Sequence, residues 1–305
     1  MAPVISILLL ILLLIPPVNP LNRLIFSPHE LSPTSPPSVT LANTDPRIHH
    51  LHTFLTPPLS TPTPLKTGVL SCYSSPTSTI TRPNATHTTL TLTPPSPIPQ
   101  SPSFATSPTA LLIALPRPLV LQRLLPQLIA LNPSHIIFYA AAKTPRDYYG
   151  HHVLKCFTNN TLPSPLDSYV IAGLTLSASH LPPQITLLPS TAAALPRFLT
   201  HTLPTLFPAA THSRILLHPT PNSPTLTHRL TTHPATLLTL GPEGGYTPAE
   251  LLLFAAHGFT TARLGGANIL RLDTAAIVAA GISQDVLDGD VLDGDVLDGG
   301  VGVKS

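Results

Sequence analysis

Apolar residues recur with two different spacings along this chain, and the spacings divide it into two halves. Between residues 86 and 93, Leu alternates with Thr, which predicts a half-buried strand. Apolar or β-branched runs at 22–26 and 65–73 predict further strands, and prolines separate them. We therefore expect residues 21–105 to form a small β-rich unit, with a Pro- and Ser-rich linker at 94–108.

Beyond the linker, short buried runs alternate with helical patterns. The runs at 135–139, 214–217 and 235–240 predict strands, and 119–131 predicts a helix that Pro126 should kink. Strands that alternate with helices indicate an α/β domain with a mostly parallel sheet. We place this domain at residues 106–284.

The clearest local signal follows the strand predicted at 235–240. Thr247-Pro248-Ala249-Glu250 is a capping box, in which Thr and Glu satisfy each other's free backbone amides and Pro occupies the first helical position. The predicted helix ends at Gly258 in a left-handed conformation. A strand at 259–264 and a helix at 273–280 are expected to follow.

Two glycine-rich loops flank this helix and strand. The first is Gly241-Pro-Glu-Gly-Gly245, and the second spans residues 264–271 around Gly265-Gly266. Glycine allows backbone to pass close to a ligand, and ligands of open α/β sheets bind at the carboxyl ends of strands. The loops therefore predict two walls of one pocket; the alternative is that both are only tight connections.

These motifs resemble the RsmE family of SPOUT RNA methyltransferases. The residues that carry the resemblance are Leu240 to Leu251, Gly258-Phe259, Leu264-Gly265 and Ile269 to Ala276, with weaker likeness at 22–26, 45–50, 115–125 and 143–154. The resemblance implies a SPOUT trefoil-knot domain at 106–284, a PUA-like β-barrel that binds RNA at 21–105, and a homodimer. It also implies S-adenosylmethionine as cofactor and small-subunit rRNA, or the assembling small ribosomal subunit, as partner.

The resemblance carries a set of site residues with it. It implies that Arg271 faces the RNA or the reacting uridine, which makes Arg271 the candidate catalytic residue. It implies RNA contacts at Arg23, Arg47 and His50. The implied cofactor-binding residues are Leu217, Leu240, Gly241, Pro242, Glu243, Gly244, Gly245, Leu264, Gly265, Ile269 and Leu270.

The implied activity is methylation of N3 of a uridine in 16S-type rRNA. The alternatives are another SPOUT reaction, such as ribose 2′-O methylation, and an RNA-binding relic without activity. The relic is motivated by departures from the family pattern: Thr175 and Leu176 stand in a region where a Glu-Gln pair is usual, and Asn268 stands where Arg is common.

Charge is unevenly distributed. The net charge of the chain is +2, but residues 1–284 hold 14 Lys and Arg against 7 Asp and Glu, which permits RNA binding. The other six acidic residues lie in an Asp-Gly repeat at 285–305, which predicts a disordered tail. Cys72 and Cys156 lack a matching second pair of ligands, so we predict no metal site.

An unbroken apolar run occupies residues 4–15, ahead of two prolines. It is shorter than the roughly 20 residues that span a bilayer, so we interpret residues 1–20 as a targeting segment and predict no stable membrane span in the mature protein. The next residues are Ser- and Thr-containing and poor in acids. This favours an organelle, a plastid over a mitochondrion, with the cytoplasm as the alternative.

Overall fold

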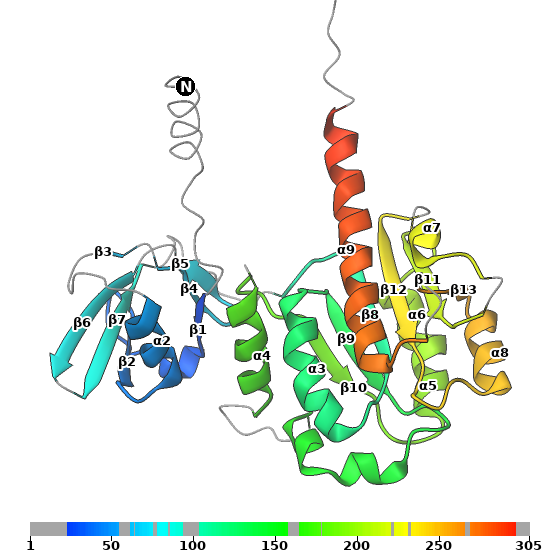
Figure 1. Ribbon diagram of the computed structural model, residues 1–305, viewed down its shortest axis with the longest axis horizontal. Helices are drawn as coiled ribbons and strands as arrows, with labels where there is room; N and C mark the ends of the chain where they lie inside the picture. The colour runs from blue at the N-terminus through cyan, green and yellow to red at the C-terminus, as the bar shows by residue number, and fades with distance from the viewer. Residues whose placement is uncertain are drawn as a thin grey trace, which may run out of the picture.

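The computed structural model describes residues 23–54, 62–63, 65–75, 78–84, 86–93, 104–157, 165–177, 179–220, 223–230, 233–265 and 269–296 (Figure 1). The predicted targeting segment at 1–20 lies outside these residues, and so does Asn268. Two units lie side by side: a β-rich unit at the amino-terminal end of the chain and a larger α/β unit (Figure 1).

The amino-terminal unit contains two small sheets. One has the order β1-β4-β5, with β1 (Leu24–Phe26), β4 (Thr67–Val69) and β5 (Tyr73–Ser75). The other has the order β2-β7-β6-β3, with β2 (Ser38–Ala42), β7 (His87–Leu92), β6 (Ser78–Asn84) and β3 (Pro62–Thr63). The short helix η1 (Pro28–Glu30) and the helix α2 (Pro46–Phe54) complete the unit. In β7 every second residue, from Thr88 to Leu92, is buried, as the alternation predicts. The β-rich unit is confirmed, and the PUA-like barrel stays a prediction.

The second unit is built on a parallel sheet of six strands in the order β10-β9-β8-β12-β11-β13. The strands are β8 (Thr109–Ala114), β9 (His135–Tyr139), β10 (Gln184–Leu187), β11 (His212–Leu217), β12 (Ala235–Leu240) and β13 (Thr260–Ala262). The predicted parallel α/β domain is therefore confirmed, and the strands predicted at 135–139 and 235–240 have the observed bounds.

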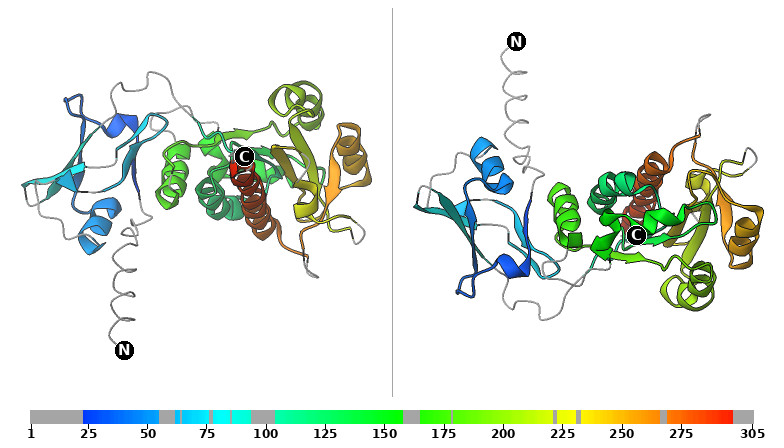
Figure 2. Two further views of the ribbon diagram at one scale, coloured as in Figure 1. Left: turned by 90° about the horizontal axis from the view of Figure 1, so that it is seen from above. Right: turned by 90° about the horizontal axis from the view of Figure 1, so that it is seen from below.

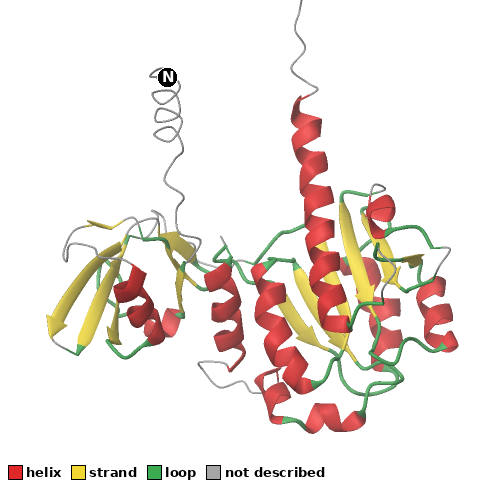
Figure 3. Ribbon diagram, in the orientation of Figure 1, coloured by secondary structure: helices red, strands yellow, loops and turns green. Residues whose placement is uncertain are grey.

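Helices cover both faces of this sheet (Figures 2 and 3). One face carries α3 (Pro118–Ala130), α4 (Pro165–Leu176), α7 (Leu226–Leu230) and α9 (Leu272–Val296). The other carries α5 (Ala194–Arg197), η4 (Phe198–Thr202), α6 (Leu203–Leu206) and α8 (Pro248–Ala256). The 3-10 helices η2 (Arg146–Gly150) and η3 (His152–Phe157) follow β9. Strand β8 is buried throughout: Leu111 and Ile113 face the first layer, and Ala110 and Leu112 face the second.

Helix α3 continues through Pro126, the residue predicted to kink it. It packs closely on α4, because a Cβ at Gly173 would lie 2.6 Å from the Cβ of Ile129 and 2.7 Å from the carbonyl oxygen of Pro126. The two units meet at α4, where the backbone N–H of Arg23 donates to the carbonyl of Thr175 at 3.3 Å.

The last helix differs from its prediction. The sequence predicts a helix at 273–280 and a disordered tail from residue 285, whereas α9 runs from Leu272 to Val296 and rises past the strands (Figure 1). The predicted disorder is therefore wrong for residues 285–296. Ala276 and Ala280 pack in the core of the unit, and Leu287 is buried as well. A helix that packing has already nucleated adds residues at little further cost.

Candidate functional site

Three parallel strands of the larger unit end at one level. Leu217 at the end of β11 pairs with Leu240 at the end of β12 and with Ala262 at the end of β13. The loops after these strands therefore emerge from the same edge of the sheet. Both predicted glycine loops lie on this edge, with the end of β11 between them.

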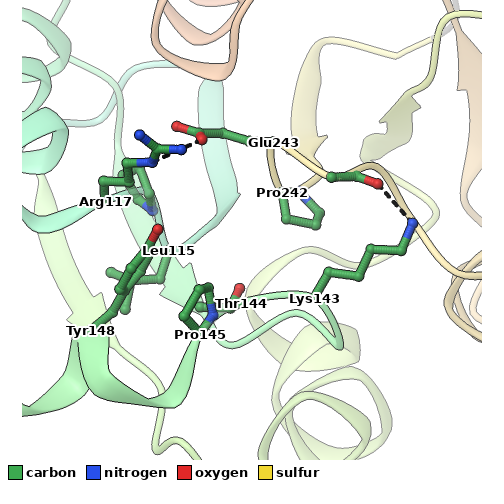
Figure 4. Close-up of a pocket in the computed structure, with 10 residues that line it drawn as sticks. Leu115, Arg117, Lys143, Thr144, Pro145, Tyr148, Pro242 and Glu243 are labelled. Atoms are coloured by element: carbon green, nitrogen blue, oxygen red, sulfur yellow. Dashed lines mark hydrogen bonds and ion pairs between the residues drawn. The ribbon is translucent and has the colours of Figure 1, made fainter.

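A pocket of about 410 Å³ opens at this edge, where β8, β9 and β12 end (Figure 4). The loops after those three strands supply its walls. The residues are Leu115, Pro116 and Arg117 after β8, Lys143, Thr144, Pro145 and Tyr148 after β9, and Pro242, Glu243 and Gly244 after β12. Three of the predicted cofactor-loop residues thus line the pocket: Pro242, Glu243 and Gly244.

The capping box of α8 holds two of these walls together. It forms as predicted: Thr247 Oγ1 accepts from the Glu250 amide at 3.3 Å, and Glu250 Oε2 accepts from the Thr247 amide at 2.8 Å. The other carboxylate oxygen of Glu250 accepts from the backbone N–H of Ala142 at 2.8 Å. Glu250 is buried, and its hydrogen bonds tie the loop after β9 to the loop after β12.

Two cations bridge to the loop after β12. Arg117 Nε lies 3.2 Å from Glu243 Oε2, and Lys143 Nζ donates to the carbonyl of Gly244 at 2.7 Å (Figure 4). The side chains of Arg117 and Glu243 are 67% and 37% exposed. An ion pair this exposed contributes about 0.2–1 kcal/mol, so it opens easily when a competing anion arrives.

Aromatic packing supports the loop from behind. A Cβ at Gly241 would lie 2.7 Å from a ring carbon of Tyr246, so only glycine fits there. The buried Tyr139 hydroxyl donates to the carbonyl of Leu240 at 3.3 Å. Burial, together with the nearby Glu250 carboxylate, raises the pKa of both phenols far above the ordinary value. Both tyrosines therefore stay neutral and act as rigid support.

The second glycine loop lies outside the pocket in Figure 4. Gly265 has open space around the position of a Cβ, and the side chain of Ile269 is 82% exposed. Leu264 and Leu270 in this loop are half-buried. In the first loop, Gly245 has φ +72°, a conformation that favours glycine. An open backbone position and an exposed apolar side chain in one loop suit a flat, partly apolar ligand.

Arg271, the predicted catalytic residue, is 70% exposed immediately before α9, with Nε 3.6 Å from Asp273 Oδ1. It does not line the pocket in Figure 4. Its position at the start of α9 puts it on the same edge of the sheet as the loop after β13.

The predicted RNA-binding residues lie in the other unit. Arg47 contacts Glu30 at 2.7 Å and Asp45 at 3.0 Å, and its guanidinium lies over the ring of Phe26. Burial opposes the charge of Arg47, but hydrogen bonds to Asp45 and Glu30 raise its pKa. The structure thus gives Arg47 a structural role, and its contact with RNA stays a prediction. Arg23 lies at the junction with α4, where its buried Nε and Nη1 have no partner among the described residues, and His50 lies in α2.

Sequence reasoning did not single out Arg117, Lys143 or Tyr148 as site residues. All three follow strands that end at the pocket, and Tyr149, next to Tyr148, donates to the carbonyl of Leu188 at 3.1 Å and fixes the loop. Burial raises the pKa of Tyr149 to about 12. The sequence feature that could have indicated these residues is their position, because each is a polar side chain that follows a buried strand.

Within the described residues, no three His, Cys, Asp or Glu side chains are placed to hold a metal ion. The same part of the chain has no helix with the length and apolar character needed to cross a membrane.

Comparison with known proteins adds independent information. A family model described as an RNA methyltransferase domain matches residues 105–284. The structure of ribosomal RNA small subunit methyltransferase E from Neisseria gonorrhoeae, bound to S-adenosyl methionine, is similar over 87% of this chain and 97% of that one, with a TM-score of 0.59 and 16% identity. A structure from Legionella pneumophila, described as a methyltransferase with bound cofactor SAM, is similar over 86% of this chain and 96% of that one, with a TM-score of 0.56 and 16% identity. No curated protein sequence matches the chain.

Proposed function

The chain belongs to the RsmE family of RNA methyltransferases, whose domain model matches residues 105–284, and from this premise we propose that it methylates N3 of a uridine in 16S-type small-subunit rRNA with S-adenosylmethionine. The observation that carries the proposal is the position of the pocket. One of its walls is the glycine loop of the family motif, and the others bring two cations and an aromatic ring to the same edge of the sheet.

The residues of the two glycine loops fit the cofactor. Gly265 leaves open space where a side chain would stand, and Ile269, later in the same loop, exposes an apolar side chain. These features suit the adenosyl part of S-adenosylmethionine, which carries an electrophilic methyl group on sulfur. Leu217 and Leu240 end the strands from which this edge is built, and Gly241 and Gly245 shape the first loop.

The pocket in Figure 4 fits a nucleotide of RNA. Arg117 and Lys143 suit phosphate and carbonyl oxygens, and Tyr148 offers a ring on which a base can stack. Proteins that recognise single-stranded RNA commonly combine positive charge with aromatic stacking. A base held here lies against the loop after β12, within reach of a methyl group bound at the same edge.

Three further features belong to the proposal. Strand β12 lies between β8 and β11, and α9 returns from edge strand β13 to pack on β8 and β12, which supports a trefoil knot. Exposed Leu119 in α3 and Val278 in the neighbouring α9 support an apolar contact with a second copy in a homodimer. The two sheets of residues 24–92 support a PUA-like barrel that contacts the RNA.

The test is methyl transfer to transcribed small-subunit rRNA, alone and assembled into subunits, followed by mass spectrometry of the nucleosides. We expect 3-methyluridine. A 2′-O-methylated nucleoside would indicate the other SPOUT reaction. No product, together with RNA binding, would indicate a non-catalytic relic.

A further inference from the structure

We propose that Glu243 accepts the imide proton of the target uracil, and that Arg117 holds this carboxylate until a phosphate of the RNA takes over the guanidinium. The inference rests on the proposed function and deepens it. Methylation at N3 requires the N3 proton to leave, so the site needs a group that can receive it. The pocket supplies one such group, the Glu243 carboxylate, and binding of the RNA releases this carboxylate from Arg117.

Glu243 is the one carboxylate among the ten residues that line the pocket. Arg117 and Lys143 are cations and cannot accept a proton. Thr144 Oγ1 already accepts from the backbone N–H of Ala141 at 3.1 Å, and Tyr148 presents a phenol. A carboxylate is therefore the best proton acceptor that this pocket offers.

Glu250 is the other carboxylate near these loops, and its environment is opposite. It is buried, and its two oxygens accept hydrogen bonds from the amides of Ala142 and Thr247 and from the Thr247 hydroxyl. Those bonds fix it in place as a structural group. The side chain of Glu243 is 37% exposed, and its carboxylate has Arg117 as its ion-pair partner.

The pair with Arg117 restrains Glu243 in the free protein. Arg117 Nε lies 3.2 Å from Glu243 Oε2, and the Arg117 side chain is 67% exposed. Arginine binds phosphate with two parallel hydrogen bonds, so a phosphate of the bound RNA competes well for it. Substrate binding then frees Glu243.

The step conserves atoms and charge. The N3–H bond breaks and its proton goes to the Glu243 carboxylate, which becomes a carboxylic acid. The electron pair on N3 forms the new bond to the methyl carbon, the bond from that carbon to sulfur breaks, and the sulfonium becomes a neutral thioether. Lys143, held 2.7 Å from the Gly244 carbonyl, is placed to offset negative charge that develops on the base. Glu243 returns its proton to water after the product leaves.

The decisive variant is Glu243→Gln, which keeps the shape and removes the proton acceptor. We expect kcat to fall by about 100-fold or more, the usual contribution of a general base. Calorimetry should show S-adenosylmethionine affinity within about twofold of wild type. RNA affinity should be unchanged or tighter, because Arg117 no longer has a competitor. Glu243→Asp should recover part of the rate.

Arg117→Gln tests the other half of the pair. Loss of one phosphate contact should weaken RNA binding and reduce the slope of log affinity against log salt by about 0.7–0.9.

The matched control for Glu243→Gln is Asp147→Asn. It removes an exposed acidic charge from the neighbouring η2 without touching the pocket lining, and it should leave kcat and RNA affinity as in wild type.

Two results would overturn the proposal: a Glu243→Gln protein that methylates at the wild-type rate, or an Arg117→Gln protein whose RNA affinity and salt slope are unchanged. Failure of the proposed function looks different, because the wild-type protein itself would then yield no 3-methyluridine.

Discussion

The carboxylate of Glu250 accepts a hydrogen bond from the backbone N–H of Ala142 at 2.8 Å, across 108 positions of the chain. The same carboxylate caps α8 through Thr247. One side chain therefore fixes both the start of the helix after the first glycine loop and the loop that carries Lys143. The capping box is a local motif, but its second oxygen gives it a long-range function.

This relationship predicts different effects for two variants of the capping box. Thr247→Ala removes the cap alone and should cost about 1 kcal/mol of unfolding free energy. Glu250→Ala also removes the bond to Ala142 and should cost roughly 1 kcal/mol more. Denaturant titration measures both values. Hydrogen exchange at the Ala142 amide should accelerate in Glu250→Ala only; equal acceleration in the two variants would contradict the link.

The glycines of the two loops predict a separation of folding from cofactor binding. Gly265→Val adds a side chain in open space, so the melting temperature should hold while S-adenosylmethionine affinity falls at least tenfold. Gly244→Val should also weaken binding, since it adds a side chain to the first loop. Its Cβ would lie 3.2 Å from Lys143 Cδ, and because that side chain is flexible and can move, the fold should persist.

Gly241→Ala is the contrasting variant. Its Cβ would lie 2.7 Å from the Tyr246 ring, so we expect a lower melting temperature. Calorimetry with S-adenosylmethionine and thermal melts decide the comparison. Normal cofactor binding by Gly265→Val would remove the second loop from the site.

A histidine pair at the opposite edge of the sheet predicts a dependence of stability on pH. His135 begins β9, its ring nitrogens are buried without a partner among the described residues, and its ring lies 5.1 Å from that of Phe207. Burial, and then the charge of His212, lowers the pKa of His135 below 6.5. Burial also lowers the pKa of His212, although a hydrogen bond to the backbone carbonyl of Pro208 opposes the shift.

The lowered pKa values of the two histidines determine how stability changes with pH. Below pH 6.5 the unfolded chain takes up protons that the folded protein resists, so stability is full above this pH and is lost as pH falls toward the depressed folded-state values. The melting temperature should therefore drop between pH 7 and pH 5. His135→Leu should flatten the drop, and an equally steep profile in that variant would show that other groups cause it.

The sequence predicted those parts of the fold that depend on local signals. The strands at 135–139 and 235–240, the capping box at Thr247 and the left-handed Gly258 are each encoded within a few residues, and the structure contains them. Strand β8 was not predicted, although it lies at the centre of the sheet. Its short apolar run follows a Pro-rich stretch, and only its pairing with β9 and β12 identifies it.

The site shows the same limit. The glycine loops are visible as motifs, but Arg117 and Glu243 are 126 positions apart and meet only because β8 and β12 are neighbours. The positive charge of Arg47 suggests a contact with RNA, yet in the fold this charge is paired with Glu30 at the end of η1. Partners of this kind depend on strand order and register, which periodicity does not determine.

The length of α9 leads to the last prediction, which concerns the carboxyl-terminal segment. Leu287 in α9 is 3% exposed, so removing residues 285–305 deletes a buried side chain together with the acidic repeat. Removing residues 289–305 keeps Leu287 and deletes four of the six aspartates.

We expect the shorter deletion to leave the melting temperature unchanged and to strengthen RNA binding slightly at low salt, because fewer negative charges oppose the phosphates. The longer deletion, and the point variant Leu287→Ala, should both lower the unfolding free energy by about 2 kcal/mol or more. Thermal melts of the three proteins separate the effects. Equal stability of the two deletions would show that Leu287 contributes nothing, and that the helix beyond Ala280 is supported by the residues before it.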